Sequence, residues 1–299
     1  MNARGVLHTT RAEVAETRSR RVKPSRLVLH GVILFALAAW LLPTAGMLVN
    51  SVRPTAEVAA SGWWTVPFAG TGLTLDNYAF VLQREGLLNA FANSLLIAVP
   101  ATAIPVALAA FAAYAFAWMQ FRGRDWLFVA FVALLAVPLQ VTLVPVLRLF
   151  RETGLSGQFL AVWLAGTGYA LPFSVYLLRN AMAELPREVL ESAWIDGAGH
   201  GRTFRNLILP MTAPAIAALS IFQFLFVWND LLVNLVILGT GNPQNLPLTV
   251  LVANLSNSLG SNWHYLMAAA FLTALLPLAV FFLFQRSFIR GITAGSVKG

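Results

Sequence analysis

The chain has 299 residues, of which 58% are hydrophobic and only 11% are charged. Because a soluble domain usually carries about 25% charged residues, this composition excludes an ordinary soluble protein and predicts that the lipid bilayer is the solvent. A net charge of +8 would suggest nucleic acid as a partner of a soluble protein, but membrane topology explains the basic residues better here. Cysteine is absent, which excludes disulfides, thiolate metal sites and cysteine nucleophiles.

Six segments are long and apolar enough to cross a bilayer as helices, since a spanning helix needs about 20 mostly apolar residues. They are residues 27–49, 88–118, 126–147, 159–178, 212–238 and 265–284. The first is longer than the apolar part of a signal peptide, about 7–15 residues, and no convincing cleavage site follows it, so we expect it to be retained. Within the six segments, Asp230 is the only Asp, Glu, Lys or Arg.

The distribution of Lys and Arg predicts the orientation in the membrane. The predicted connections on one side, including both termini, contain 16 of these residues. The opposite side contains four: Arg53, Arg84, Arg148 and Arg151. By the positive-inside rule, both termini are expected in the cytoplasm of a bacterial cell, with the chain crossing the inner, or plasma, membrane several times.

The predicted organisation has one membrane domain between two tails. Residues 1–26 are polar and are expected to form a disordered cytoplasmic tail that determines topology without a specific partner. Residues 27–288 form the transmembrane domain, and 289–299 a cytoplasmic C-terminal tail. Ahead of the second span, Asp76 is placed to cap a short helix.

Residues 184–210 form the most informative connection. Pro186 and Glu188 suit the first turn of a short helix, and Gly197 suits its left-handed C-terminal cap. A second short helix is predicted at about 202–209, ending at Pro210. Val189, Leu190, Ala193 and Trp194 share the apolar face of the first helix. Such a helix either docks into a partner or lies on the membrane surface, and physical arguments alone leave both open.

This connection resembles the EAA motif of the membrane subunits of ABC importers, with Ser192 where alanine is usual. The matching residues are Glu191, Ala193, Trp194, Asp196, Gly197, Ala198, Phe204 and Pro210. Further motifs are similar to the carbohydrate-uptake branch, the MalG-like permeases: 75–78, Trp228-Asn229-Asp230 and the C-terminal 285–299. The resemblance covers nearly the whole chain from about residue 27.

The resemblance implies an all-α membrane protein with the six-helix fold of type I ABC importer permeases and a cytoplasmic coupling helix. It also implies four kinds of partner in a heteromeric complex: a second homologous permease subunit, a dimer of ATP-binding subunits, an extracytoplasmic solute-binding protein and the transported sugar. The eight motif residues are then expected to couple this chain to the ATPase.

No catalytic constellation accompanies these motifs. The stretch 197–203 superficially resembles a phosphate loop, but it is one residue too short, has Arg202 in place of lysine, and follows a helix instead of a strand. The chain is therefore expected to be a transport subunit and not an enzyme, with no cofactor or metal of its own. ATP and Mg²⁺ would bind the partner ATPase.

The fifth predicted span carries the polar side chains that suit a transport pathway. Gln223, Asp230 and Asn234 fall on one helical face with Val227, and Asn229 is adjacent. Because a charge in the hydrocarbon layer is costly, Asp230 is expected to face protein or water. It either lines a solute pathway or pairs in the subunit interface or caps a broken helix.

The spans contain no Lys or Arg, which favours a neutral, hydroxyl-rich substrate over glycerol phosphate. We expect a di- or oligosaccharide or another neutral sugar, with glycerol phosphate or a polyol as the alternative. The outer connection 239–264 is rich in amides and hydroxyls, and Asn254, Asn257 and Asn262 are candidates for contact with the binding protein or are simply solvated. The predicted function is the permease subunit of an ATP-driven sugar importer working by alternating access. The alternative is a stand-alone secondary transporter or channel for a small polar solute, which would not need the 184–210 motif.

Overall fold

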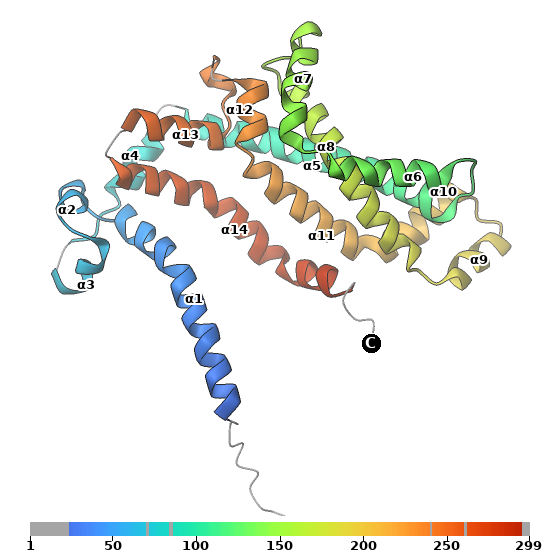
Figure 1. The fold of residues 1–299 in the computed structure, drawn as a ribbon, viewed down its shortest axis with the longest axis horizontal. Coiled ribbons are helices and arrows are strands. Elements are labelled where there is room, and N and C mark those ends of the chain that lie inside the picture. The colour runs from blue at the N-terminus through green and yellow to red at the C-terminus, as the bar shows by residue number, and fades with distance from the viewer. Residues whose placement is uncertain (1–23, 70–71, 84–85, 240, 260–261, 295–299) are drawn as a thin grey trace, which may run out of the picture. The chain divides into compact units, whose positions relative to one another are not determined.

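The part of the chain that the structure describes is built from helices (Figure 1). The computed structural model describes residues 24–69, 72–83, 86–239, 241–259 and 262–294. In chain order the elements are α1 (Pro24–Ser51), α2 (Thr55–Ala60), η1 (Trp63–Thr65), α3 (Val66–Ala69), α4 (Asp76–Gln83), α5 (Leu87–Trp118), α6 (Arg124–Ala133), η2 (Leu134–Ala136), α7 (Leu139–Glu152), α8 (Phe159–Ala183), α9 (Arg187–Ile195), α10 (His200–Thr203), η3 (Phe204–Ile208), α11 (Leu209–Trp228), α12 (Leu232–Leu238), η4 (Pro243–Asn245), α13 (Leu248–Leu259) and α14 (Trp263–Ala294). Of these, η3 is a π-helix, and η1, η2 and η4 are 3-10 helices.

The chain separates into two compact units, residues 1–49 and 50–299. Most of α1 belongs to the first unit, and its apolar stretch Val28–Ser51 is long enough to cross a membrane. The second unit holds four more helices long and apolar enough to cross a membrane and one bent helix pair. Counting the bent pair as one span gives six spans in the described residues, and the chain is a multi-pass membrane protein.

The predicted third span, residues 126–147, is not one straight helix. The structure breaks it between Ala136 and Leu139, and the two parts meet at an angle of 99°. Pro138 explains the break: it has no backbone N–H to continue the helical ladder, and it pushes Val137 into an extended conformation, with φ −82° and ψ 114°.

The predicted fifth span, residues 212–238, was also wrong as a continuous helix. Helix α11 ends at Trp228, and the separate helix α12 begins at Leu232. At its other end the helical run starts earlier than predicted, at His200, and passes through Pro210 without ending there. The backbone N–H of Leu209 bonds to the carbonyl of Phe204, five residues back, and this π-helical turn precedes the proline that lacks an N–H.

Helices α5 and α8 have the most extensive contact of any helix pair in the described part of the second unit. Small side chains line their contact: Ala101, Ala109, Ala113 and Ala161 are fully buried, and a Cβ on Gly166 would lie 3.6 Å from that of Ala101. Small residues let two backbones approach closely in lipid, where no hydrophobic effect drives helices together.

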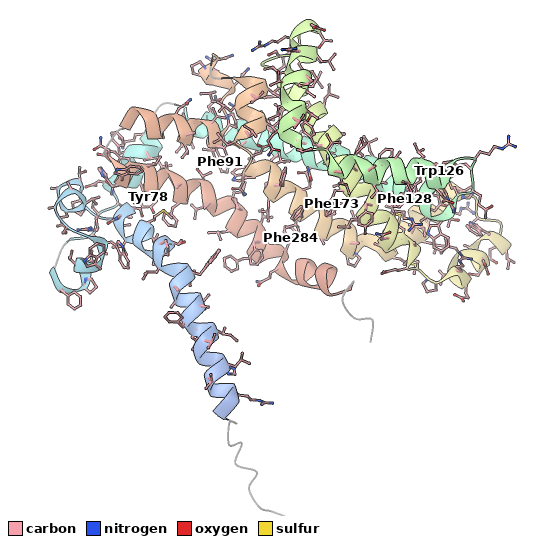
Figure 2. All side chains as sticks on the ribbon, viewed as in Figure 1. Tyr78, Phe91, Trp126, Phe128, Phe173 and Phe284 are labelled. Carbon is pink, nitrogen blue, oxygen red and sulfur yellow. The ribbon has the colours of Figure 1, made fainter. Side chains whose placement is uncertain are left out.

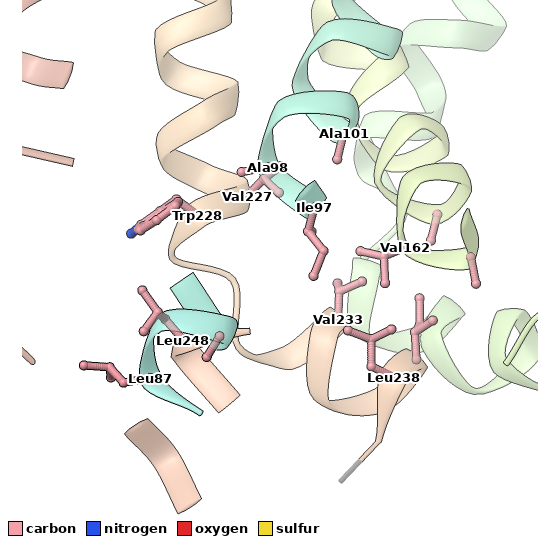
Figure 3. Packing of buried hydrophobic residues seen from close by; sticks show 14 of the residues in the cluster. Leu87, Ile97, Ala98, Ala101, Val162, Val227, Trp228, Val233, Leu238 and Leu248 are labelled. Atoms are coloured by element: carbon pink, nitrogen blue, oxygen red, sulfur yellow. The ribbon is translucent and has the colours of Figure 1, made fainter. Parts of the chain in front are cut away.

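Apolar packing joins α5 to α8, α11 and α12 around the helix break. Ile97, Ala98 and Ala101 of α5 lie between Val162 of α8 and Val227 of α11 (Figure 3). A second cluster gathers around Tyr114 near the end of the unit that carries α9 and α10. In Figure 1, these two short helices and α2–α4 lie at opposite ends of the second unit.

Two smaller predictions are corrected at the end of the unit that carries α4. Asp76 begins helix α4 and does not cap it; Leu75 precedes the helix, and the backbone N–H of Asp76 donates to the Thr74 hydroxyl at 3.1 Å. The predicted outer connection 239–264 contains two helices, η4 and α13. At the termini, residues 1–23 and 295–299 of the predicted tails lie outside the described residues, and α14 extends into the predicted C-terminal tail as far as Ala294.

Candidate functional site

A cavity of about 380 Å³ lies where α8, α11 and α12 meet η2 and α7. Its polar side chains come from Thr142, Tyr169, Gln223, Asp230 and Asn234. The remaining lining is apolar and partly aromatic, with Phe173, Phe222 and Phe226. No lysine or arginine is among the described residues that line it.

Aromatic rings from two helices border the cavity. The rings of Phe173 on α8 and Phe222 on α11 are 5.9 Å apart, and Figure 2 shows Phe173 where these helices run together. The Thr142 hydroxyl lies 3.2 Å from that of Tyr169, which connects α7 to α8. Sequence reasoning missed both hydroxyl residues. The sequence offered one indication of a cavity near Tyr169: two glycines, Gly166 and Gly168, lie just before it in the chain, and both line the cavity.

The break between α11 and α12 places Asp230 at the cavity. Its Oδ1 accepts a hydrogen bond from the backbone N–H of Val233 at 3.0 Å, so the carboxylate caps α12. The carbonyl of Asp230 accepts bonds from Asn234 Nδ2 at 2.6 Å and from Thr249 Oγ1 at 3.0 Å. These side-chain bonds replace the helical ladder and explain why the predicted continuous span is interrupted.

The structure brings three of the four predicted pathway residues together. All three line one cavity: Gln223 from α11, Asn234 from α12 and Asp230 from the break between these helices. Asn229 does not join them: it is exposed, and its Nδ2 donates to the Leu225 carbonyl at 2.8 Å. Of the alternatives for Asp230, capping a broken helix is therefore confirmed, and that same position faces the cavity.

The predicted coupling segment folds into α9, a turn and α10. Gly197 follows α9 with φ +77°, the left-handed conformation that the sequence predicted. Leu190 is fully buried, whereas Trp194 is 38% and Ile195 is 85% exposed. Of the other motif residues, Glu191, Asp196 and Pro210 are exposed, Ala193 and Ala198 are half-buried, and Phe204 is buried. Helix α9 therefore holds to the bundle through Leu190 and leaves an apolar and acidic edge uncovered.

A polar contact joins this segment to the long helix α5. The Tyr114 hydroxyl lies 3.0 Å from Nδ1 of His200, at the start of α10. The His200 ring also meets Trp194 of α9 edge-on, with centroids 6.3 Å apart, and Phe204 packs against Tyr114 at 5.2 Å. Sequence reasoning did not single out Tyr114 or His200, because 86 residues separate them.

At the opposite end of the unit, side chains of α5 hold the segment 242–248. Asn89 and Asn93 both donate to the carbonyl of Gln244 at 2.6 Å, and Asn93 also donates to that of Leu246 at 3.1 Å. The Ser94 hydroxyl accepts from the backbone N–H of Leu248 at 2.8 Å. Segment 242–248 continues into α13, where the Thr249 hydroxyl donates to the Asp230 carbonyl.

The predicted binding-protein contacts lie in and after α13. Asn254 is half-buried in α13, and Asn262 is half-buried directly ahead of α14. The side chain of Asn257 lies outside the described part of the structure.

Comparison with known proteins places the chain in a family. Residues 95–294 match the family described as "Binding-protein-dependent transport system inner membrane component". The chain is 52% identical over 276 residues to the osmoprotective compounds uptake permease protein GgtD of Synechocystis sp. (strain ATCC 27184 / PCC 6803 / Kazusa), covering 91% of this chain and 92% of that protein. It is 38% identical over 378 residues to the alpha-glucoside transport system permease protein AglG of Rhizobium meliloti (strain 1021), covering 94% and 99%.

A solved structure agrees on the fold. It is that of a bacterial ABC transporter involved in the import of the acidic polysaccharide alginate, with a TM-score of 0.77 at 18% identity, over 91% of this chain and 98% of that one. The helix arrangement is thus that of an ABC importer permease, and the relatives are transport subunits and not enzymes. The chain belongs to the family of binding-protein-dependent transport system inner membrane components.

Proposed function

We propose that this permease forms one half of the membrane pathway of an ATP-driven importer and passes a neutral, hydroxyl-rich glycoside through the cavity beside Asp230. The observation that carries the proposal is the lining of this cavity. Aromatic rings stand beside two amides, a carboxylate and two hydroxyls, without a lysine or arginine among the described lining residues.

This combination of groups suits a glycoside. A pyranose ring has apolar C–H faces, which Phe173 and Phe222 can cover, and a rim of hydroxyls, which Gln223 and Asn234 can bind. An anionic solute fits less well, because Asp230 would repel it and the described residues that line the cavity include no lysine or arginine to bind it. Glycerol phosphate is therefore the weaker alternative. The name of one relative, an alpha-glucoside transport permease, agrees with a neutral solute.

Helix α9 is the proposed contact with the ATP-binding subunit. Its uncovered edge combines the apolar side chains of Trp194 and Ile195 with the acidic Glu191 and Asp196. A helix lying flat on the membrane would place these two carboxylates in a poor position, whereas a groove on a soluble subunit accepts both kinds of group. ATP and Mg²⁺ would be held by that subunit. A second permease would complete the pathway, and a solute-binding protein would deliver the sugar.

The test is uptake into proteoliposomes containing this chain, its second permease and the ATPase, with the solute-binding protein added outside. The solutes compared are a glucosylated polyol, an α-linked disaccharide, a uronic acid oligosaccharide and glycerol phosphate. We expect ATP-dependent uptake of one or both of the neutral glycosides. Uptake confined to the acidic oligosaccharide or glycerol phosphate would refute the substrate class, and uptake by this chain without the ATPase would favour the stand-alone carrier.

A matched pair of variants tests the cavity. Gln223→Leu removes a buried cavity amide, and Asn229→Leu removes an exposed amide six residues away that does not line the cavity. We expect Gln223→Leu to raise the solute concentration needed for half-maximal uptake about tenfold, the equivalent of about 1.4 kcal/mol, while Asn229→Leu leaves it unchanged. Equal effects of the two variants would remove the cavity from the pathway.

A further inference from the structure

We propose that residues 63–69 form an interfacial anchor that inserts aromatic side chains into the lipid headgroup region at the end of α1. The proposal concerns a surface of the second unit that lies apart from the cavity and from α9, and it does not depend on the transported solute. The partner is the bilayer itself, on the side that the basic residues predict to be outside.

The first observation is the exposure of large aromatic side chains on a short ordered segment. Trp64 is 64% and Phe68 is 90% exposed. Trp63 meets Trp64 edge-on, with ring centroids 6.1 Å apart. The stretch 54–69 contains a single charged residue, Glu57. Exposed aromatic rings on a nearly uncharged segment are costly in water and favourable at a membrane–water interface, where Trp is enriched.

The second observation fixes the segment at the level of the membrane surface. The first membrane span ends at Ser51, and the last one begins at Trp263. The Thr55 hydroxyl, at the start of α2, lies 3.0 Å from Nε2 of His264. Helix α2 is therefore tied to the point where a span begins, four residues after another span has ended. Trp263 itself is 55% exposed, as expected of a residue at the interface.

The third observation is a set of hydrogen bonds that holds the chain directly ahead of the aromatic segment. Arg53 is fully buried, and its guanidinium donates to Asn50 Oδ1, to the carbonyls of Glu57 and Ser61, and to the Ser61 hydroxyl, at 2.6–3.0 Å. Asn77 of α4 donates to the carbonyl of Arg53 at 2.9 Å. These bonds hold residues 50–61, and the Thr65 hydroxyl, within the aromatic segment, donates to the Gly62 carbonyl at 2.8 Å and to the Ser61 hydroxyl at 3.2 Å.

Gly62 sets the position of the Trp64 ring. A Cβ at residue 62 would overlap the indole of Trp64, so a larger residue there would require the ring to move. The neighbouring Trp63 is half-buried by comparison, and the exposed rings of Trp64 and Phe68 remain as the apolar surface. A depth of about 5–10 Å at the boundary of headgroups and acyl chains is typical of such interfacial segments.

The experiment uses the absence of cysteine from the chain. Trp64→Cys, Phe68→Cys and, as the water-exposed control, Gln244→Cys each introduce one thiol into this subunit for a nitroxide spin label. Each variant is assembled with cysteine-free partner subunits in lipid nanodiscs, and collisions of the label with oxygen and with a water-soluble nickel chelate are measured. Phe68 is almost fully exposed, so its replacement should leave folding intact even if that of Trp64 does not.

We expect oxygen accessibility to exceed nickel accessibility at residues 64 and 68, at a depth of about 5–10 Å, and the reverse at residue 244. Nickel-dominated collisions at both positions would overturn the proposal, because the segment would then face water. Low accessibility to both reagents would also overturn the proposal, because the rings would then be covered by a protein. That protein would be the second permease if accessibility is already low without the binding protein. It would be the binding protein if accessibility falls only when the binding protein is added.

Discussion

The carboxylate of Asp230 caps helix α12 by accepting a hydrogen bond from the backbone N–H of Val233, 3.0 Å away. The same residue lines the cavity, so its cap and its charge can be separated by substitution. Asn is as good an N-cap as Asp, and Ala is not. Asp230→Asn should therefore leave stability unchanged, whereas Asp230→Ala should lose about 0.5–2 kcal/mol.

Because Asp230→Asn keeps the cap, its effect on solute uptake measures the contribution of the negative charge of Asp230. If a sugar hydroxyl donates to the carboxylate, Asp230→Asn should weaken uptake about tenfold, because a hydrogen bond to a charged group is stronger by about 1.4 kcal/mol than one to a neutral group. Thermal unfolding followed by tryptophan fluorescence gives the stability, and proteoliposome assays give the uptake. Normal transport by the Asn variant would leave Asp230 with the capping role alone.

The hydrogen bond between Tyr114 and His200 predicts a second variant. Tyr114→Phe removes only the hydroxyl that lies 3.0 Å from Nδ1 of His200, and it should cost about 0.5–1.5 kcal/mol of stability. Because this bond connects α10 to α5, we also expect fewer solute molecules imported per ATP hydrolysed. The control is Tyr176→Phe, which keeps the stacking of ring 176 on Phe128 and lies on the exposed side of α8.

The readout for this pair is the ratio of uptake to ATP hydrolysis. An unchanged ratio in Tyr114→Phe, together with normal assembly of the ATPase, would make this contact purely structural. Failure of any ATPase to assemble with the wild-type chain would instead contradict the proposed coupling through α9.

Two glycines of the turn after α9 provide a matched test of backbone geometry. Gly197 has φ +77°, Gly199 has φ −73°, and a Cβ would meet nothing within 4 Å at either position. Gly197→Ala should therefore cost about 1–2 kcal/mol through its left-handed conformation. Gly199→Ala carries no such penalty. Co-purification of the ATPase subunit, scored at increasing salt and temperature, should weaken for Gly197→Ala first. Equal behaviour of the two variants would show that the turn geometry does not matter for docking.

The hydrogen bonds between α5 and segment 242–248 predict that two asparagines differ in their contribution to stability. Asn93 is 5% exposed and donates to two carbonyls, whereas Asn89 is exposed and donates to one. Asn93→Ala removes the side-chain donor to the buried Leu246 carbonyl and should cost about 1–3 kcal/mol, whereas Asn89→Ala leaves Asn93 bonded to the Gln244 carbonyl and should cost less than about 1 kcal/mol. Thermal unfolding of the two variants checks the difference, and a larger loss for Asn89→Ala would contradict the assigned geometry.

Several elements of the fold followed from local sequence. Hydrophobic length located α1 and α5 to within a few residues, and it located the starts of α8 and α14, which continue five and ten residues beyond their predicted ends. The left-handed Gly197 and the helix that precedes it followed from the pattern of Pro186, Glu188 and the apolar face. These features depend on interactions within one or two turns of chain, so the sequence contains the information directly.

The two breaks were harder to predict, because length and composition do not distinguish a kinked span from a broken one. At Pro138 the two parts of the predicted third span meet at 99°, although a proline in an apolar segment is compatible with either outcome. At Asp230 the break is stabilised by Thr249, which arrives from α13 nineteen residues later. Hydropathy alone indicated neither the bend at Pro138 nor the contact between Thr249 and Asp230.

By itself, the sequence determined the membrane environment, the number of spans and the family motif, because composition, apolar length and residue spacing are properties of the linear chain. The tertiary structure alone decided which side chains meet. It placed Tyr169 and Thr142 in the same cavity as Asp230, brought Tyr114 to His200, and tied Thr55 to His264. These contacts join helices that are distant in the chain, and only the packing of apolar and small residues between those helices sets the distances.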